Sequence, residues 1–136
     1  MSIESFLRTI TRWAEADSRI AGLILVGSHA SGAARQDSDV DLVLLCRTPE
    51  DLISDTSWIE VFGAVLCARQ EDYGRLTSVR VQYGDGLEVE FGITDPEWAS
   101  CPLDPGTRHV LIGGTRLLYD STGFIRRALG SLSEPS

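Results

Sequence analysis

Two aspartates at the start of a predicted strand, Asp39 and Asp41, are the residues best suited to chemistry. Because one residue separates them, a strand would point both side chains from the same face, about 7 Å apart along the chain. Two carboxylates on an otherwise buried strand repel each other and lose hydration unless a cation binds them. Mg²⁺ prefers oxygen ligands, so the pair predicts a magnesium site that also takes a substrate phosphate. The competing interpretation is a solvated strand start or a turn.

The segment before these aspartates is suited to binding phosphate. Gly27 lets the backbone turn sharply at the end of a strand, and Ser28 offers a hydroxyl group and its own N–H. A short helix that follows would direct its N-terminal amides at an anion. Gly32 permits close approach of a ligand to the backbone. His29 could bond a phosphate, but in a short polar loop we expect it to face solvent.

A third carboxylate comes from a predicted hairpin over residues 78–93 that turns at Gly84-Asp85-Gly86. Its register sets apolar against apolar side chains on one face and places Arg80 opposite Glu90 on the other. We prefer Glu90 as the third acid because it lies nearer the anchored end of the hairpin, with Glu88 as the alternative. An ion pair with Arg80 is the rival explanation for Glu90. Three acids around two cations would stabilise both the attacking and the leaving oxygen in phosphoryl transfer.

The sequence predicts one α/β domain over residues 1–136, and its helices and strands must position these residues. We expect a mixed and partly antiparallel sheet with flanking helices. We expect the helices mainly on one face, the active face open and residues 131–136 as a loose tail. Apolar spacing and turn residues predict helices over 3–14, from 49, over 106–112 and from 124, and strands over 20–26, 40–45, 59–68, 78–93 (the hairpin) and 116–119.

The composition excludes several classes of function. The 136 residues carry a net charge of −8, and all 12 basic residues are arginine, which excludes lysine nucleophiles. Scattered arginines on an acidic chain argue against a polynucleotide partner. The longest apolar run, 20–26, is too short to span a membrane, so we expect a cytoplasmic protein. The three cysteines form no metal or redox spacing, and we expect reduced, mostly buried thiols.

The run Val26-Gly27-Ser28-His29-Ala30-Ser31-Gly32, followed by Ser38-Asp39-Val40-Asp41-Leu42, resembles the signature of the DNA polymerase beta-type nucleotidyltransferase superfamily. It is most similar to small bacterial members, which include minimal nucleotidyltransferases and aminoglycoside nucleotidyltransferase domains. The resemblance implies the palm fold of that superfamily. Many small members have an arginine where this chain has Ser31, so a phosphate-binding cation has to come from Arg35 or is absent.

The resemblance also implies roles for the site residues. Gly27, Ser28, Gly32 and Ser38 would form the nucleotide site. Asp39, Asp41 and Glu90 would bind two Mg²⁺ ions, and Glu90 could instead draw the proton from the attacking hydroxyl.

The implied reaction moves a nucleoside monophosphate from a nucleoside triphosphate, with ATP the expected donor, to an acceptor hydroxyl on a small molecule or a protein. Family members commonly carry a further helical domain that forms one wall of the acceptor pocket. We expect a second copy of this chain or another protein to supply such a wall here. The contact would be made through an exposed sheet edge or the apolar side of the hairpin. The alternative is a regulatory, antitoxin-like nucleotidyltransferase module that acts by binding or modifying a protein partner.

Overall fold

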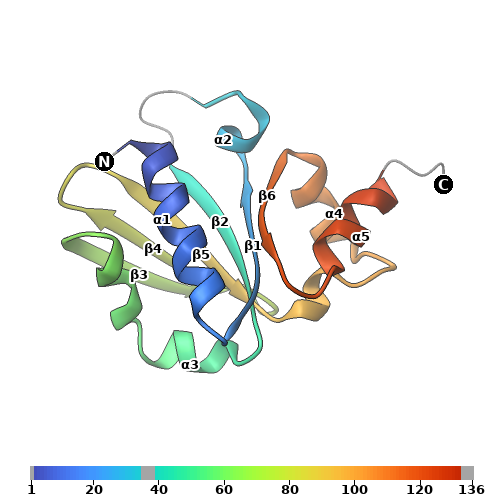
Figure 1. Cartoon of the computed structure of the whole chain (residues 1–136), viewed down its shortest axis with the longest axis horizontal. Helices are drawn as coiled ribbons and strands as arrows, with labels where there is room; N and C mark the ends of the chain where they lie inside the picture. Colours follow the sequence, from blue (N-terminus) through green and yellow to red (C-terminus); the bar gives the residue numbers. More distant parts are fainter. Residues whose placement is uncertain (1, 35–38, 133–136) are drawn as a thin grey trace.

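The computed structural model describes residues 2–34 and 39–132, and Figure 1 shows how they are arranged. Six strands of this part of the chain form one sheet. The strands are β1 (Ile20–Val26), β2 (Val40–Cys46), β3 (Val65–Asp72), β4 (Thr77–Tyr83), β5 (Glu88–Thr94) and β6 (Thr115–Asp120). The helices are α1 (Ile3–Ala16), α2 (Ser28–Ser31), α3 (Pro49–Ser54), α4 (Pro105–Ile112) and α5 (Phe124–Leu132), with short 3-10 helices η1 (Ser57–Phe62) and η2 (Pro96–Ala99).

The strand order is β3-β4-β5-β2-β1-β6. β2 and β5 run parallel, and the other neighbouring strands are antiparallel. The mixed, partly antiparallel sheet is therefore confirmed. The hairpin register is confirmed as well, since Val79 pairs with Phe91 and Arg80 with Glu90.

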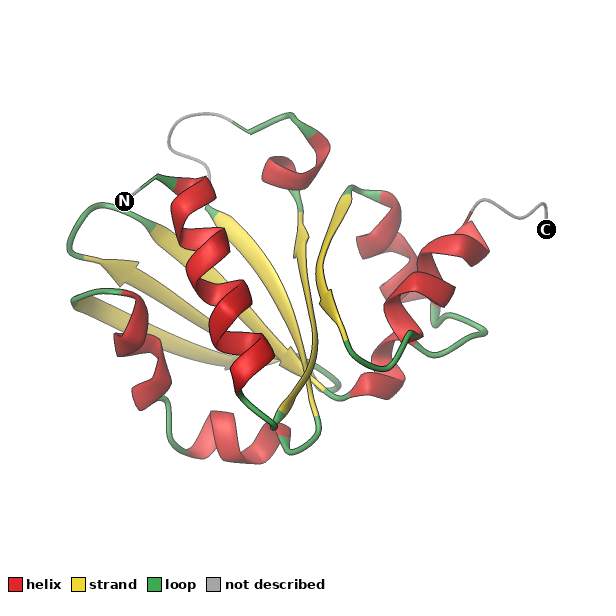
Figure 2. Ribbon diagram, in the orientation of Figure 1, coloured by secondary structure: helices red, strands yellow, loops and turns green. Residues whose placement is uncertain are grey.

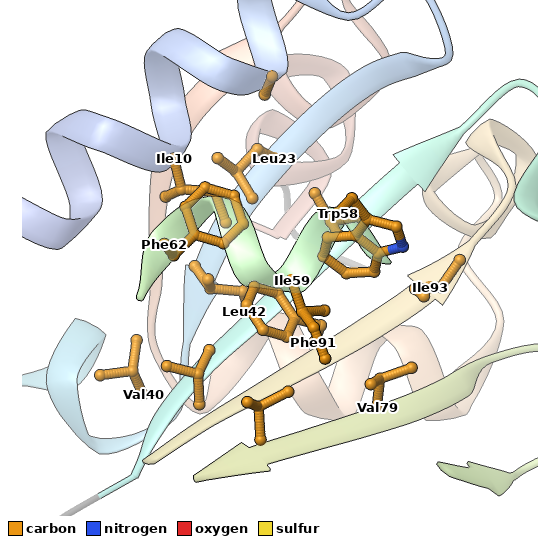
Figure 3. Packing of buried hydrophobic residues seen from close by; sticks show 14 of the residues in the cluster. Ile10, Leu23, Val40, Leu42, Trp58, Ile59, Phe62, Val79, Phe91 and Ile93 are labelled. Atoms are coloured by element: carbon orange, nitrogen blue, oxygen red, sulfur yellow. The ribbon is translucent and has the colours of Figure 1, made fainter. Parts of the chain in front are cut away.

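Helix α1 covers one face of the sheet (Figure 1). The Ser2 hydroxyl caps it by accepting a hydrogen bond from the Ser5 N–H at 3.1 Å. Trp58 and Phe62 from η1 complete this face, and the Trp58 ring packs edge-on against Phe91 of β5, with centroids 5.0 Å apart. Figure 3 shows these aromatic rings gathered over the strands. This layer packs against one face of the sheet and so fixes the positions of β2 and β5.

The opposite face is covered too, by η2, α4 and α5 beside β6 (Figure 2). Trp98, Leu111 and Ile125 pack there against residues of β1 and β2. The expectation of helices mainly on one face is therefore wrong. The reason is that β1 is apolar at every position, so both of its faces need cover, and all seven of its residues are buried.

The segment expected to be a strand over 59–68 is divided. Residues 57–62 form η1, and β3 begins at Val65. Trp58, Ile59 and Phe62 are buried at helical spacing, and a short apolar run does not by itself distinguish a helix from a strand. β3 is an exposed edge strand in the described chain, with Leu66 66% exposed.

The C-terminal helix is longer than expected. Residues 131 and 132 belong to α5 rather than to a loose tail, and residues 133–136 lie outside the described residues. Within 2–34 and 39–132, no helix has both the length and the hydropathy that crossing a bilayer requires.

Candidate active site

The strand register brings the predicted acids together. Asp41 of β2 lies beside Val26 of β1 on one side and beside Glu90 of β5 on the other, and Glu90 lies opposite Arg80 of β4. Neighbouring residues in a sheet share a face, so this row crosses four strands on one side. Asp39 precedes Asp41 by two residues. The parallel pairing of β2 and β5 is thus what joins the carboxylates.

Burial and neighbouring charges shift the pKa of Asp41. It is half-buried, and its pKa is raised to about 6, first because burial disfavours the charged form and then because Glu90 and Asp39 carry like charges. Coulombic interaction with Arg80, and to a smaller extent with His29, opposes this rise in the pKa of Asp41. A cation that binds here would relieve the repulsion among the three carboxylates.

Arg80 bridges two of the three acids. One terminal guanidinium nitrogen, Nη1, donates to Oδ2 of Asp39 at 3.0 Å, and the other, Nη2, donates to Oε2 of Glu90. The ion pair considered as the rival explanation for Glu90 is therefore present. It does not separate Glu90 from Asp41, because the register keeps the two side by side.

Carboxylate oxygens are the type of ligand that a divalent cation prefers, but these carboxylates are not arranged as a metal site in this structure. Hard oxygen ligands are what Mg²⁺ selects, and the Arg80 guanidinium already stands as a cation between Asp39 and Glu90. Among residues 2–34 and 39–132, no group of three or more Asp, Glu, His or Cys side chains is set to hold a metal ion. In this structure the Arg80 guanidinium therefore occupies the space between the carboxylates of Asp39 and Glu90.

Gly27 links the predicted phosphate segment to the acids. It has φ +76°, and a Cβ atom at this position would lie 2.6 Å from Oδ2 of Asp41. Ser28 begins α2 directly afterwards, and Gly32 ends it in the left-handed conformation with φ 82°. Gly27 lines the cavity described below, whereas Ser28 and Gly32 are not among its lining residues. Ser38 and Arg35 lie outside the described residues.

The two candidate third acids differ in position. Glu90 lines the same cavity as Asp39 and Asp41. Glu88 is exposed and lines a separate hollow with Arg69 and Gln82, and a hydrogen bond with Asp39 raises the pKa of Glu88. Glu90 thus lines the cavity together with the aspartate pair, whereas Glu88 contacts Asp39 from the neighbouring hollow.

The cavity beside the acids has a volume of about 760 Å³. Its lining includes the three acids and, from α4 and η2, the residues Thr107, His109, Val110 and Trp98. The lining from α4 and η2 was missed from the sequence, because the active face of the sheet was expected to be open. The exposed His109 beside the buried Thr107 shows that one side of α4 packs while another faces outward. The hollow is large enough for a small-molecule ligand.

Comparison with known proteins identifies a matching family model and a similar fold. The family model of streptomycin adenylyltransferase matches residues 1–118. The fold is similar to that of an aminoglycoside 6-adenyltransferase from Bacillus subtilis, with a TM-score of 0.59, 17% identity, and coverage of 73% of this chain and 37% of that one. The chain thus spans less than half of that structure.

Two further solved structures are more distant. The Cid1 poly(U) polymerase aligns with a TM-score of 0.44 and 21% identity over 68% of this chain and 31% of that one. The polymerase core of TRAMP aligns with a TM-score of 0.46 and 16% identity over 66% and 28%. No curated protein matches the sequence. Given the extent of the family match, the chain belongs to the streptomycin adenylyltransferase family, within the DNA polymerase beta-type nucleotidyltransferase superfamily.

Proposed function

We propose that the protein transfers a nucleoside monophosphate from a nucleoside triphosphate, ATP by expectation, to an acceptor hydroxyl group. The observation that carries the proposal is the row that sets Asp41 beside Glu90, with Asp39 two residues away and Gly27 against the Asp41 carboxylate. These residues line a cavity large enough for a substrate.

Asp39, Asp41 and Glu90 would hold two Mg²⁺ ions, whose charge would offset that of the triphosphate. Gly27, Ser28, Gly32 and Ser38 are proposed to form the nucleotide site. The acceptor oxygen bonds to the α-phosphorus, the bond from that phosphorus to the bridging oxygen breaks, and pyrophosphate leaves. Glu90 takes the acceptor proton or helps to hold the cations.

The acceptor is proposed to be a cationic or neutral small molecule, or a basic protein surface. A chain with net charge −8 and acids around its cavity would repel a polynucleotide. A second copy or another protein would complete the acceptor site. The apolar side of the β4–β5 hairpin is not available for this contact, because Val79, Val81 and Phe91 are buried in the core. The exposed edge of β3 is the surface that fits such a partner.

The test compares thermal unfolding with and without Mg²⁺ and ATP. Both together should raise Tm, since a ligand at about 100 times its Kd stabilises the native state by about 2.7 kcal/mol. The double variant Asp39→Asn, Asp41→Asn should lose this rise. A control pair with the same charge change, Glu50→Gln with Asp51→Asn on exposed positions of α3, should keep it. An unchanged rise in the Asp39, Asp41 variant would remove the site from the proposal.

Activity is measured with ATP labelled at the α-phosphate, alone and with cell extract. Transfer of label to a small molecule or a protein supports the proposed reaction. Binding of a protein without any transfer of label would favour the regulatory alternative instead.

A further inference from the structure

We propose that Arg80 is a positioning residue that replaces a metal ion between Asp39 and Glu90, and that it moves to the triphosphate when metal and nucleotide bind together. This inference rests on the proposed function. It adds a specific consequence, which is that metal and nucleotide should each strengthen the binding of the other through this one side chain.

Arg80 contacts two of the carboxylates that would bind the metal ions. Its two terminal nitrogens reach different carboxylates, Asp39 directly before β2 and Glu90 on β5, so a single guanidinium bridges acids from two segments of the chain. Charge-assisted pairs of this kind are stronger than neutral hydrogen bonds. Without metal, Arg80 therefore holds these two carboxylates in place near Asp41.

The position of Arg80 allows the side chain to move without moving the backbone. Arg80 is held in β4, which is paired with β3 on one side and β5 on the other. Its side chain is 44% exposed and lines the main cavity as well as the neighbouring hollow that contains Glu88. A change of side-chain torsions is thus enough to turn the guanidinium from the carboxylates to a ligand in the cavity.

The guanidinium group of Arg80 can bind the phosphate groups of a triphosphate in place of the carboxylates. Its fork of N–H donors fits phosphate oxygens as well as carboxylate oxygens, and it keeps its charge at any working pH. A free metal ion would have to break both ion pairs of Arg80 and leave the guanidinium without a partner. A metal ion that arrives with a triphosphate supplies the replacement partner in the same step.

The consequence is a coupling between two ligands. Free metal should bind weakly, and nucleotide should increase metal affinity by the same factor by which metal increases nucleotide affinity. A partly exposed ion pair changes an equilibrium by up to about fivefold, so loss of both pairs should strengthen the binding of free metal by roughly tenfold.

The test measures Mn²⁺ binding without nucleotide, from the electron paramagnetic resonance signal of free Mn²⁺. Arg80→Ala should bind Mn²⁺ roughly tenfold more tightly than the unmodified protein. Arg80→Lys, which keeps the charge but loses the fork, should show a smaller gain. The matched control is Arg69→Ala on β3, because Arg69 lies directly opposite Arg80 but pairs with Glu71 and does not line the main cavity. Its Mn²⁺ affinity should change by less than about twofold.

The second measurement is the coupling itself, the ratio of the Mn²⁺ dissociation constants without and with ATP. Arg80→Ala should reduce this ratio by roughly tenfold, while Arg69→Ala should leave it within about twofold. Circular dichroism and Tm identify a misfolded variant. Because removing Arg80 leaves like charges unpaired, Arg80→Ala should have a lower Tm without metal, and Mn²⁺ should restore it.

The outcomes separate the two proposals. If the unmodified protein binds Mn²⁺ with ATP but Arg80→Ala changes neither the Mn²⁺ affinity nor the coupling, the role of Arg80 is overturned and the proposed function stands. The role is also overturned if Arg69→Ala gives the same gain, which would show a general charge effect. If the unmodified protein and the variants all fail to bind Mn²⁺ with ATP, the proposed function fails, and the role of Arg80 fails with it.

Discussion

Gly27 lies against Asp41 so closely that a Cβ atom at Gly27 would come within 2.6 Å of the Asp41 Oδ2 atom. Gly27 also has φ +76°, a backbone conformation that side chains rarely adopt. The glycine of the phosphate segment is therefore required for two reasons, the turn it makes and the carboxylate it leaves room for.

We predict that Gly27→Ala displaces the Asp41 carboxylate, removes the Tm rise caused by Mg²⁺ and ATP, and lowers the unfolding free energy by about 1–3 kcal/mol. The control is Gly86→Ala in the β4–β5 turn, where φ is +92° and nothing lies within 4 Å of a Cβ atom. This control should lower stability but keep the ligand-dependent rise. Equal ligand responses in the two variants would contradict the prediction.

Asp41→Asn should stabilise the protein at neutral pH. Because the pKa of Asp41 is raised to about 6 in the folded state, the folded chain binds this proton more tightly than the unfolded chain. The group therefore favours folding most below about pH 4, and that contribution is lost as pH rises through 6. A shift of this size corresponds to about 3 kcal/mol at most, which partial exposure reduces to about 1 kcal/mol.

Urea unfolding at pH 7.5 and pH 4 checks this prediction. The gain of the Asn variant over the unmodified protein should be present at pH 7.5 and largely absent at pH 4. Glu50→Gln, an exposed position on α3, serves as the control for removal of one negative charge. A variant that is less stable at pH 7.5 would show that the Asp41 carboxylate is held by favourable contacts instead.

Asp120→Ala should cost stability without affecting ligand binding. Asp120 is buried at the end of β6 and accepts hydrogen bonds from the backbone N–H groups of Gly123 and Arg126, each at 3.0 Å, at the start of α5. Loss of such a cap lowers the unfolding free energy by about 0.5–2 kcal/mol. Urea unfolding measures that loss, and the Tm rise with Mg²⁺ and ATP should persist. A lost ligand response would place Asp120 in the site.

The cysteines should differ in reactivity. Cys46 is buried, and burial raises the pKa of its thiol to about 12, whereas Cys67 and Cys101 are exposed, contrary to the expectation of mostly buried thiols. A disulfide reagent at pH 8 should modify two thiols quickly and the third only as the protein unfolds. Cys46→Ser should remove the slow phase. Three equally fast reactions would contradict the packing of Cys46 in the core.

The sequence by itself determined the local features of this protein. Alternating side chains and a glycine turn specified the register of the β4–β5 hairpin, including Arg80 opposite Glu90, because neighbouring residues alone decide both. The apolar run of β1 and the amphipathic pattern of α1 likewise predicted a buried strand and a helix that packs on the sheet. The spacing of Asp39 and Asp41 also predicted that both side chains share one face at the start of a strand, and β2 begins at Val40, between them.

Only the tertiary structure decided which strand lies beside β2. The parallel pairing that puts Glu90 next to Asp41 joins segments about fifty residues apart, and no local pattern encodes it. The same holds for α4, which walls the cavity, and for the reach of Arg80 across β5 to Asp39. These contacts depend on how buried faces pack against each other, and that free energy belongs to the assembled sheet and helices rather than to any one segment.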